Sequence, residues 1–512
     1  MIILVPLSIA ALAIRLFPVF LAPRNLVRYV ADDAFYYFQI SKNIATGGGV
    51  TFDGLNKTNG FHPIYVVLLV VLFRWFPNSR HGPIRAALVF LGLLNVATAW
   101  FVYAFVLALA GPWAALFASA VWLFNPAVIY TSLQGTEASI WVFLGALSAY
   151  LWFWMRLTGN EGAWTVIFLL GMLTGLAFLA RSEAILLFGA IGLDLFLVSQ
   201  AGSIVLSVAR VALYSIGALL VVSPWLAWNS KNFGKLTQTS GDIIAYHRHH
   251  VALLGTTGLF RFVNFVRLGM GNTVYAFNRF LDFVLGDRII TALFSGIVIG
   301  VLLAGPGLAL SSFSLRDIAF LVVFITLVIL FYGGWLWNFQ DWYFLFACFA
   351  GTIFVGIGGR VLLETPLSSE TSALTVFAIL LVLVFAAIDI RTGVRGRLKH
   401  QPVMYEAARW LYDNTDKDVR IGSFNSGIIG YYSDRTVVNL DGVINNEAAF
   451  AIRRGQLLEY IRETNIKYVV DFEIGVKRYG SFMGGDLDRH LNPVKKFEGT
   501  WHGTQLTVYK VL

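Results

Sequence analysis

The chain has 512 residues, of which 57% are hydrophobic and only 13% are charged. A soluble globular protein would carry about 25% charged residues, so the composition excludes an ordinary soluble enzyme. The net charge of +9 does not indicate nucleic-acid binding, because no run of basic residues is interleaved with aromatic ones. Basic residues beside membrane spans and anionic headgroups explain it. The single cysteine, Cys348, excludes an intramolecular disulfide and a cysteine-based zinc site and is expected to pack in a core.

Apolar segments of near membrane-spanning length recur along most of the chain and predict a polytopic α-helical membrane protein. They lie near 3–22, 62–76, 86–109, 113–131, 138–155, 164–180, 183–199, 204–228, 288–310, 317–334, 342–362 and 371–390. The first segment lacks a basic leader and a small-residue cleavage site, so we expect it to be retained as a span. Two long polar interruptions, 23–61 and 229–287, separate the apolar segments.

The side of the membrane is predicted from basic residues in short loops, which favour the cytoplasm. Arg74, Arg80 and Arg85 would place the 77–85 turn there. The 23–61 and 229–287 loops and the C-terminal part are then expected on the extracytoplasmic face of an inner or plasma membrane. Termini on opposite sides require an odd number of spans, so we expect about eleven to thirteen.

Charge density rises after about residue 395, which divides the chain into a transmembrane domain, 1–394, and a soluble domain, 395–512. In the soluble part helical patterns such as PVMYEAARWLYDN alternate with strand patterns such as KYVVDF and QLTVYKVL. This alternation predicts an α/β domain with a partly parallel sheet. GSFNSGIIGYY contains neither GxGxxG nor GxxxxGK[ST], which favours a tight strand-to-helix turn over a phosphate cradle.

The acidic pair Asp32-Asp33 precedes AFYYFQISKNIA, which predicts a short helix. A helix-start role explains one of the two acids. It does not explain two, because adjacent carboxylates at a membrane surface lose hydration and repel each other. We therefore predict a functional pair that acts as a general base or a metal ligand. The aromatic residues at 35–38 would let this helix lie in the membrane interface.

Four further residues stand at the ends of apolar segments. His62, just before a proline, is either a helix-start residue or a substrate contact. Glu137 has the same two interpretations. Arg181 and Glu183 share a very short turn, where they either pair with each other or meet an anionic headgroup.

The 229–287 segment is cationic, and Lys231, His247 and Arg248 lie in its first part. Its YHRHH cluster has no accompanying cysteine and no HExxH frame, so a phosphate site for a lipid-linked substrate is favoured over a metal site. In WNFQDWYF, an aromatic belt accounts for Tyr343, whereas Asp341 requires a further role.

Several of these stretches resemble the membrane glycosyltransferases of the GT-C superfamily, in particular a bacterial branch related to terminal arabinofuranosyltransferases and mannosyltransferases. They are ADDAFYYFQISKNIATGGGVTFDGLNKTNGFHPIY, LQGTE, LARSE, NSKNFG, WNFQDWYF and FNSGIIGYYSDRTVVNLDGVINN, and they span nearly the whole chain. The resemblance implies a GT-C-like fold and a polyprenyl-phosphate sugar donor. It also implies that Asp32 is the general base, that Asp33 assists, and that Glu137 is a second acidic motif. If the reaction uses a divalent Mg or Mn ion, Asp32 and Glu137 would hold it. The second motif is a lone Glu and not a fuller acidic cluster, which argues against a tightly bound ion.

The resemblance also implies an acceptor glycan, lipid or protein. In the soluble domain Tyr431, Asp441 and Asn445 either contact this acceptor or stabilise their loops. The remaining substrate contacts are predicted from charge and location. They are Lys231, His247 and Arg248 for the donor phosphate, and His62, Arg181, Asp341 and Tyr343 for other parts of the substrate. A secondary transporter is the main alternative, but its ionisable groups would lie near the bilayer midplane in repeated halves. A non-catalytic scaffold and an oligosaccharyl- or protein glycosyltransferase are the others.

Overall fold

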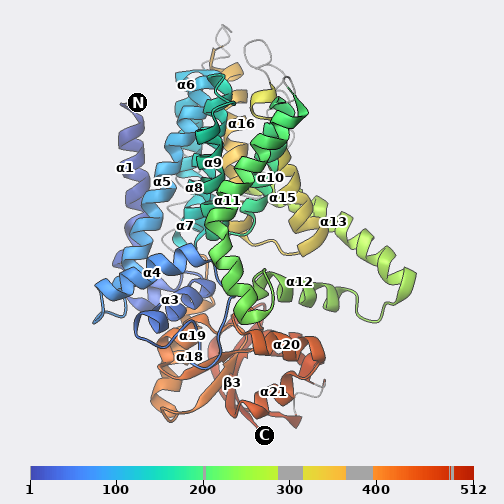
Figure 1. The fold of residues 1–512 in the computed structure, drawn as a ribbon. Coiled ribbons are helices and arrows are strands. Elements are labelled where there is room, and N and C mark those ends of the chain that lie inside the picture. The colour runs from blue at the N-terminus through green and yellow to red at the C-terminus, as the bar shows by residue number, and fades with distance from the viewer. Residues whose placement is uncertain (1, 200–202, 286–314, 365–395, 484, 486–488) are drawn as a thin grey trace.

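The computed structural model describes residues 2–199, 203–285, 315–364, 396–483, 485 and 489–512. A tall bundle of membrane helices stands on a smaller C-terminal α/β domain, and the N-terminus lies at the end of the bundle far from that domain (Figure 1). The larger helices of the bundle are α1 (Leu4–Leu16), α4 (Pro63–Trp75), α5 (Gly82–Ala110), α6 (Pro112–Phe124), α7 (Pro126–Leu133), α8 (Ala138–Leu157), α9 (Trp164–Ala180), α10 (Ala184–Ser199), α11 (Ile204–Phe233), α15 (Ala319–Ile329) and α16 (Leu345–Glu364).

Within the described residues, five helical segments are long and apolar enough to cross a membrane. They are Gly82–Ala110, Ala138–Leu157, Ile204–Phe233, Ala319–Leu336 and Asp341–Gly359. The bent pair α6 and α7, with 48° between its halves, would make a sixth, and four shorter apolar helices accompany them. The multi-pass helical architecture is thus confirmed. The spans predicted near 288–310 and 371–390 lie outside the described residues.

The 77–85 turn lies beside the C-terminal domain, so its predicted place on the opposite side of the membrane is wrong. Arg80 Nη2 is 3.0 Å from Asp434 Oδ1 of that domain, and Arg85 donates to the Leu21 carbonyl. The arginines thus pair with protein groups and not with cytoplasmic headgroups. Helix α4, which leads into this turn, has 13 residues and a length of about 20 Å, too short for a hydrocarbon core of about 30 Å.

Both polar interruptions contain helices, and the second is largely helical. The first contains α2 (Pro23–Leu26) and α3 (Asp32–Ala45), and the second contains α12 (Thr239–Ala252) and α13 (Gly258–Leu285). The aromatic residues 35–38 of α3 are at most 9% exposed, because they pack against α4 and the C-terminal domain. The expected interfacial placement of this aromatic face is therefore wrong. Helices α12 and α13 project to one side of the bundle (Figure 1).

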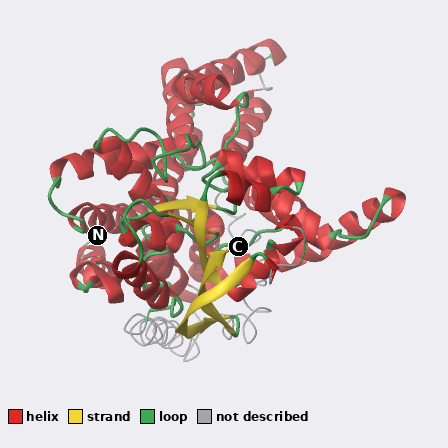
Figure 2. Ribbon diagram, turned by 90° about the horizontal axis from the view of Figure 1, so that it is seen from below, coloured by secondary structure: helices red, strands yellow, loops and turns green. Residues whose placement is uncertain are grey.

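The C-terminal domain contains a five-stranded mixed sheet in the order β2-β1-β3-β5-β4, with helices packed around it (Figure 2). Strand β1 is parallel to β2 and β3, and β5 is antiparallel to β3 and β4. The strands are β1 (Arg420–Ser423), β2 (Thr436–Asn439), β3 (Ile466–Phe472), β4 (Leu491–Trp501) and β5 (Thr504–Val511). The helices are α18 (Gln401–Asn414), α19 (Gly427–Ser433), α20 (Asn446–Arg454), α21 (Leu457–Glu463) and α22 (Glu473–Arg478). The predicted α/β domain with a partly parallel sheet is confirmed.

The domain is close-packed on the membrane part at the carboxyl ends of its parallel strands. A Cβ added to Gly427, after β1, would lie 2.0 Å from the Asp32 carbonyl oxygen. A Cβ added to Gly60 would lie 2.0 Å from the carbonyl oxygen of Val443, which follows β2. Ligands of open α/β sheets bind at this edge, and here the edge faces α3.

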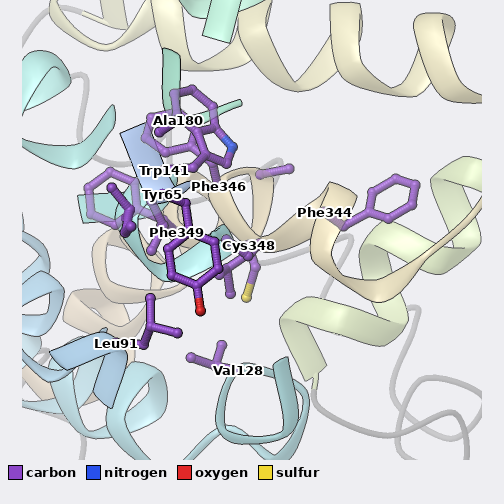
Figure 3. Packing of buried hydrophobic residues seen from close by; sticks show 14 of the residues in the cluster. Tyr65, Leu91, Val128, Trp141, Ala180, Phe344, Phe346, Cys348 and Phe349 are labelled. Carbon is purple, nitrogen blue, oxygen red and sulfur yellow. The ribbon is translucent and has the colours of Figure 1, made fainter. Parts of the chain in front are cut away.

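Aromatic and aliphatic side chains fill the interior of the helical bundle above this contact (Figure 3). Cys348 is fully buried among them, as expected from the sequence. The Tyr65 hydroxyl donates to the carbonyl oxygen of Gly135 at 2.7 Å. This bond ties α4 to the Gly135-Thr136-Glu137 turn that carries one of the predicted acids.

Candidate active site

Two adjoining cavities lie between α3, α12, the 338–343 segment and the C-terminal domain. Their volumes are about 150 Å³ and about 100 Å³. We call them the outer cavity and the inner cavity. They share the lining residues Asp33, Tyr36, Ile244, Tyr343 and Val443. Both therefore meet at the start of α3, where the acidic pair stands.

The two predicted acids have different environments. Asp32 is 8% exposed, and its two carboxylate oxygens accept the backbone N–H of Gly427 at 3.1 Å and of Ile428 at 2.7 Å. It therefore caps the N-terminus of α19 from another domain. Asp33 lies about 100° around the helix from Asp32, since successive residues of an α-helix are that far apart. Its exposed side chain lines both cavities.

Asp33 is exposed where it lines the cavities, although the surrounding protein removes much of its hydration. This loss of hydration raises its pKa to about 7, with further raising effects from Asp441 and Glu137 and an opposing one from Arg181. Burial also raises the pKa of Asp441 to about 7, against the hydrogen bond from Val443 N. A carboxyl group with a pKa near neutrality can accept and return a proton at physiological pH.

Burial likewise raises the pKa of Asp32 to about 7, although the hydrogen bonds from Ile428 and Gly427 act in the opposite direction. Both of its oxygens are occupied, so it has less freedom to receive a substrate proton than Asp33 has.

One wall of the inner cavity is formed by Glu137 and Arg181, which belong to a buried network of charged side chains. Arg181 Nε and Nη2 donate to the two oxygens of Glu183 at 2.7 and 3.0 Å, and its Nη1 bonds Glu137. The Tyr332 hydroxyl also donates to Glu183, at 2.7 Å. One guanidinium thus serves two carboxylates. Of the two interpretations open from the sequence, the geometry favours pairing of Arg181 with Glu183 over contact with a headgroup.

His62 lines the inner cavity at the start of α4. Its Nε2 is 3.8 Å from Glu137 Oε1. Burial, and then the charge of Arg181, lower the pKa of His62 to about 3. The imidazole is therefore neutral, and this contact is not an ion pair.

The far wall of the outer cavity is basic and comes from both domains. His247 and Arg248 lie on α12, and Arg478 ends α22. Arg248 Nη2 approaches Asn338 Oδ1 at 3.5 Å. Burial, followed by the charges of Arg478 and Arg248, lowers the pKa of His247 to about 4, so this ring is neutral too. Its Nε2 is buried without a hydrogen-bond partner among the described residues.

The remaining predicted residues line neither cavity. Lys231 is exposed on α11. Asp341 forms an ion pair with Arg279. Tyr431 packs against Phe35, and Asn445 caps α20 by accepting from two backbone N–H groups. By contrast, Tyr343 lines both cavities and Asp441 lines the outer one.

Several lining residues were not singled out from the sequence: Tyr36, Asn338, Gln340, Arg478 and Tyr479. Asn338 and Gln340 belong to the WNFQDWYF stretch that carries the family resemblance, so a signal for them existed. Arg478 had none, because a lone arginine at the end of a soluble helix has the pattern of an exposed residue.

The donor groups do not fit a metal ion shared by Asp32 and Glu137. Asp32 is bonded to α19 and Glu137 to Arg181. The YHRHH histidines diverge around α12, where His247 stacks on Tyr479 and His249 contacts Trp337. Among the described parts of the chain, no three His, Cys, Asp or Glu side chains gather in a metal-binding cluster.

Comparison with protein families gives two matches. Residues 63–228 match the family described as Dolichyl-phosphate-mannose-protein mannosyltransferase. Residues 390–509 match a Domain of unknown function (DUF8728). No curated protein matches the chain at the significance required.

Solved structures share the fold over almost the whole chain. The archaeal oligosaccharyltransferase AglB from Archaeoglobus fulgidus, in complex with an inhibitory peptide and a dolichol-phosphate, is 14% identical with a TM-score of 0.61, covering 98% of this chain and 74% of AglB. The same enzyme with Zn and sulfate also has a TM-score of 0.61 and 14% identity, with 97% and 72% coverage. ArnT from Cupriavidus metallidurans bound to undecaprenyl phosphate is 12% identical with a TM-score of 0.56, covering 99% and 97%. The family match in the helical part and this shared fold identify the chain as a multi-pass membrane glycosyltransferase of the GT-C class.

Proposed function

We propose that the enzyme transfers a sugar from a polyprenyl-phosphate donor to an acceptor hydroxyl, with Asp33 as the general base. One observation carries the proposal: Asp33, whose pKa lies near neutrality, shares a cavity at the ends of the membrane helices with Arg248, which has no carboxylate partner among the described residues. A lipid-held donor and a water-borne acceptor can meet only at such a boundary. The bound undecaprenyl phosphate of ArnT supports the class of donor.

The reaction follows from these two ends of the outer cavity. The acceptor oxygen forms a bond to the anomeric carbon while the bond from that carbon to the phosphate oxygen breaks. The phosphate leaves with the bonding electron pair, and the acceptor proton passes to Asp33. A base must lie within about 3 Å of that proton's oxygen, which the exposed carboxylate of Asp33 allows. Arg248 and His247 would stabilise the charge that develops on the phosphate.

Asp32 has a different part in this proposal from the one that the family resemblance implies. Its contacts with Gly427 and Ile428 make it a positioning residue, which holds the start of α3 against α19. Asp33, the next residue, is thereby fixed in the cavity. The geometry thus favours the second acid of the pair as the base.

The acceptor is a glycan, lipid or protein. We place the reaction on the extracytoplasmic face of the inner or plasma membrane, because in the enzymes that the chain resembles the acidic motif stands on the first external loop. A transporter would need ionisable groups near the bilayer midplane. Here Asp33 and Arg181 lie at helix ends, and Arg248 lies on α12 in a cavity shared with the C-terminal domain, which favours the transferase.

The test is to incubate the purified full-length protein with a panel of radiolabelled polyprenyl-phosphate sugars and with glycan, lipid and peptide acceptors. We expect one donor to yield a labelled product together with free polyprenyl phosphate. A labelled peptide would assign the protein-glycosylating alternative. Substrate uptake into proteoliposomes with no labelled product from any donor would contradict the proposal.

A further inference from the structure

Two arginines face the same cavity from separate domains. Arg248 comes from α12, and Arg478 comes from α22 in the domain of unknown function. Each carries a positive charge, and partial burial followed by the charge of Arg478 lowers the pKa of Arg248. Both residues are exposed where they line the cavity. Like charges held close together repel each other, and a bound anion reduces that repulsion.

Neither arginine has a carboxylate partner within the described ranges. By contrast, Arg181 is neutralised by Glu183 and Arg279 by Asp341. The polar contact of Arg248 is the amide of Asn338 at 3.5 Å. The wall between the two arginines includes His247, which is 8% exposed and whose Nε2 has no hydrogen-bond partner among those residues. Three groups able to bind an anion therefore share one wall.

This wall is rigidly assembled across the domain boundary. Tyr479, next to Arg478, stacks on Phe424 with ring centroids 4.4 Å apart and on His247 with centroids 4.6 Å apart. Ile243, one turn before His247, is 1% exposed and packs in the hydrophobic core of the C-terminal domain. The position of α12, and with it Arg248, therefore depends on this domain.

We propose that the domain at 390–509 completes the donor site: Arg478, together with Arg248 and His247, binds the phosphate of the lipid-linked sugar and of the lipid phosphate that is released. The inference rests on the proposed function, because it assigns the anion to the donor. The domain then contributes to donor binding and not only to acceptor binding. Its folding and docking become a condition for activity.

The test measures binding of three probes to the full-length protein in detergent: undecaprenyl phosphate, undecaprenol and inorganic phosphate. We expect the wild type to prefer the lipid phosphate to the lipid alcohol and to inorganic phosphate. The Arg478→Ala variant should lose about tenfold in affinity for the lipid phosphate, because a charge-assisted contact is removed, and none for the alcohol. Arg478→Lys keeps the charge without the planar fork and should lose less.

Lys477→Ala is the matched control, because it removes the same charge from the adjacent exposed position of α22, outside the cavity lining. Unchanged lipid-phosphate binding by Arg478→Ala, or an equal loss in Lys477→Ala, would overturn the inference and leave the proposed function standing. A wild type that binds undecaprenol as well as undecaprenyl phosphate would contradict the proposed function itself. Equal binding of inorganic phosphate would show that the lipid assignment is wrong. If Arg478→Ala does not fold, the same measurement on Arg478→Gln, which removes the charge but keeps most of the side-chain volume, takes its place, and unchanged lipid-phosphate binding by that variant would overturn the inference.

Discussion

Replacement of Asp32 by alanine should loosen α19 at the domain contact. Both oxygens of Asp32 accept backbone N–H groups of this helix, from Gly427 and Ile428. The residue at the N-cap position of α19, Ser426, makes no capping bond with its own side chain. Ile428 is fully buried, so water reaches these N–H groups poorly once the carboxylate is removed.

The expected cost follows from these two bonds. A buried N–H left without a partner costs about 1–3 kcal/mol, so the loss of both should destabilise this contact by about 2–6 kcal/mol. Asp32→Asn keeps one acceptor oxygen, and its cost should be about half of that.

Hydrogen–deuterium exchange of peptides covering 424–433 measures this effect directly. Since about 1.4 kcal/mol corresponds to a tenfold change, the Asp32→Ala protein should exchange between about 30-fold and about 20,000-fold faster there. Asp33→Asn is the control, because Asp33 makes no bond to α19, and exchange should stay at the wild-type rate. Wild-type exchange in Asp32→Ala would refute the assignment of Asp32 as an inter-domain cap.

Two other predictions concern the same region. Because loss of hydration raises the pKa of Asp33 to about 7 and a base acts in its deprotonated form, kcat/KM should rise between about pH 6 and about pH 8 and then level off; a profile that is flat across this interval would speak against Asp33 as the base. Gly60→Ala places a Cβ 2.0 Å from the Val443 carbonyl oxygen and should separate the domains, seen as a lower melting temperature and lost transfer. Gly241→Ala, which has nothing within 4 Å, is the control and should be neutral or slightly stabilising; equal effects of the two substitutions would contradict the steric argument.

Much of the architecture follows from local patterns. The hydrophobic segments predicted the helical bundle, and the alternating patterns of the C-terminal part predicted its helices and its parallel strands, because both depend on periodicity that is visible within one segment. The prediction of membrane side from basic residues was wrong for the 77–85 turn. Arg80 is neutralised by Asp434, which lies 354 positions away in the chain. A local pattern contains no information about such a partner.

The site was predicted only in part, because local patterns show its residues but not their partners from distant parts of the chain. Charge and family motifs indicated seven of the residues that line the two cavities: Asp33, Glu137, His62, Arg181, His247, Arg248 and Tyr343. The division of roles between Asp32 and Asp33 could not be predicted, because it depends on which of the two faces α19. Arg478 could not be found either, since its role depends on the docking of the C-terminal domain against α12.

The central claim is that Asp33 is the base of a lipid-phosphate-dependent glycosyltransferase. The most direct measurement is single-turnover sugar transfer by Asp33→Asn, at saturating concentrations of the donor that the wild type uses. We predict a rate about 10²- to 10⁴-fold below that of the wild type, with donor affinity and the exchange of α19 unchanged. A wild-type rate of transfer by Asp33→Asn would contradict the claim.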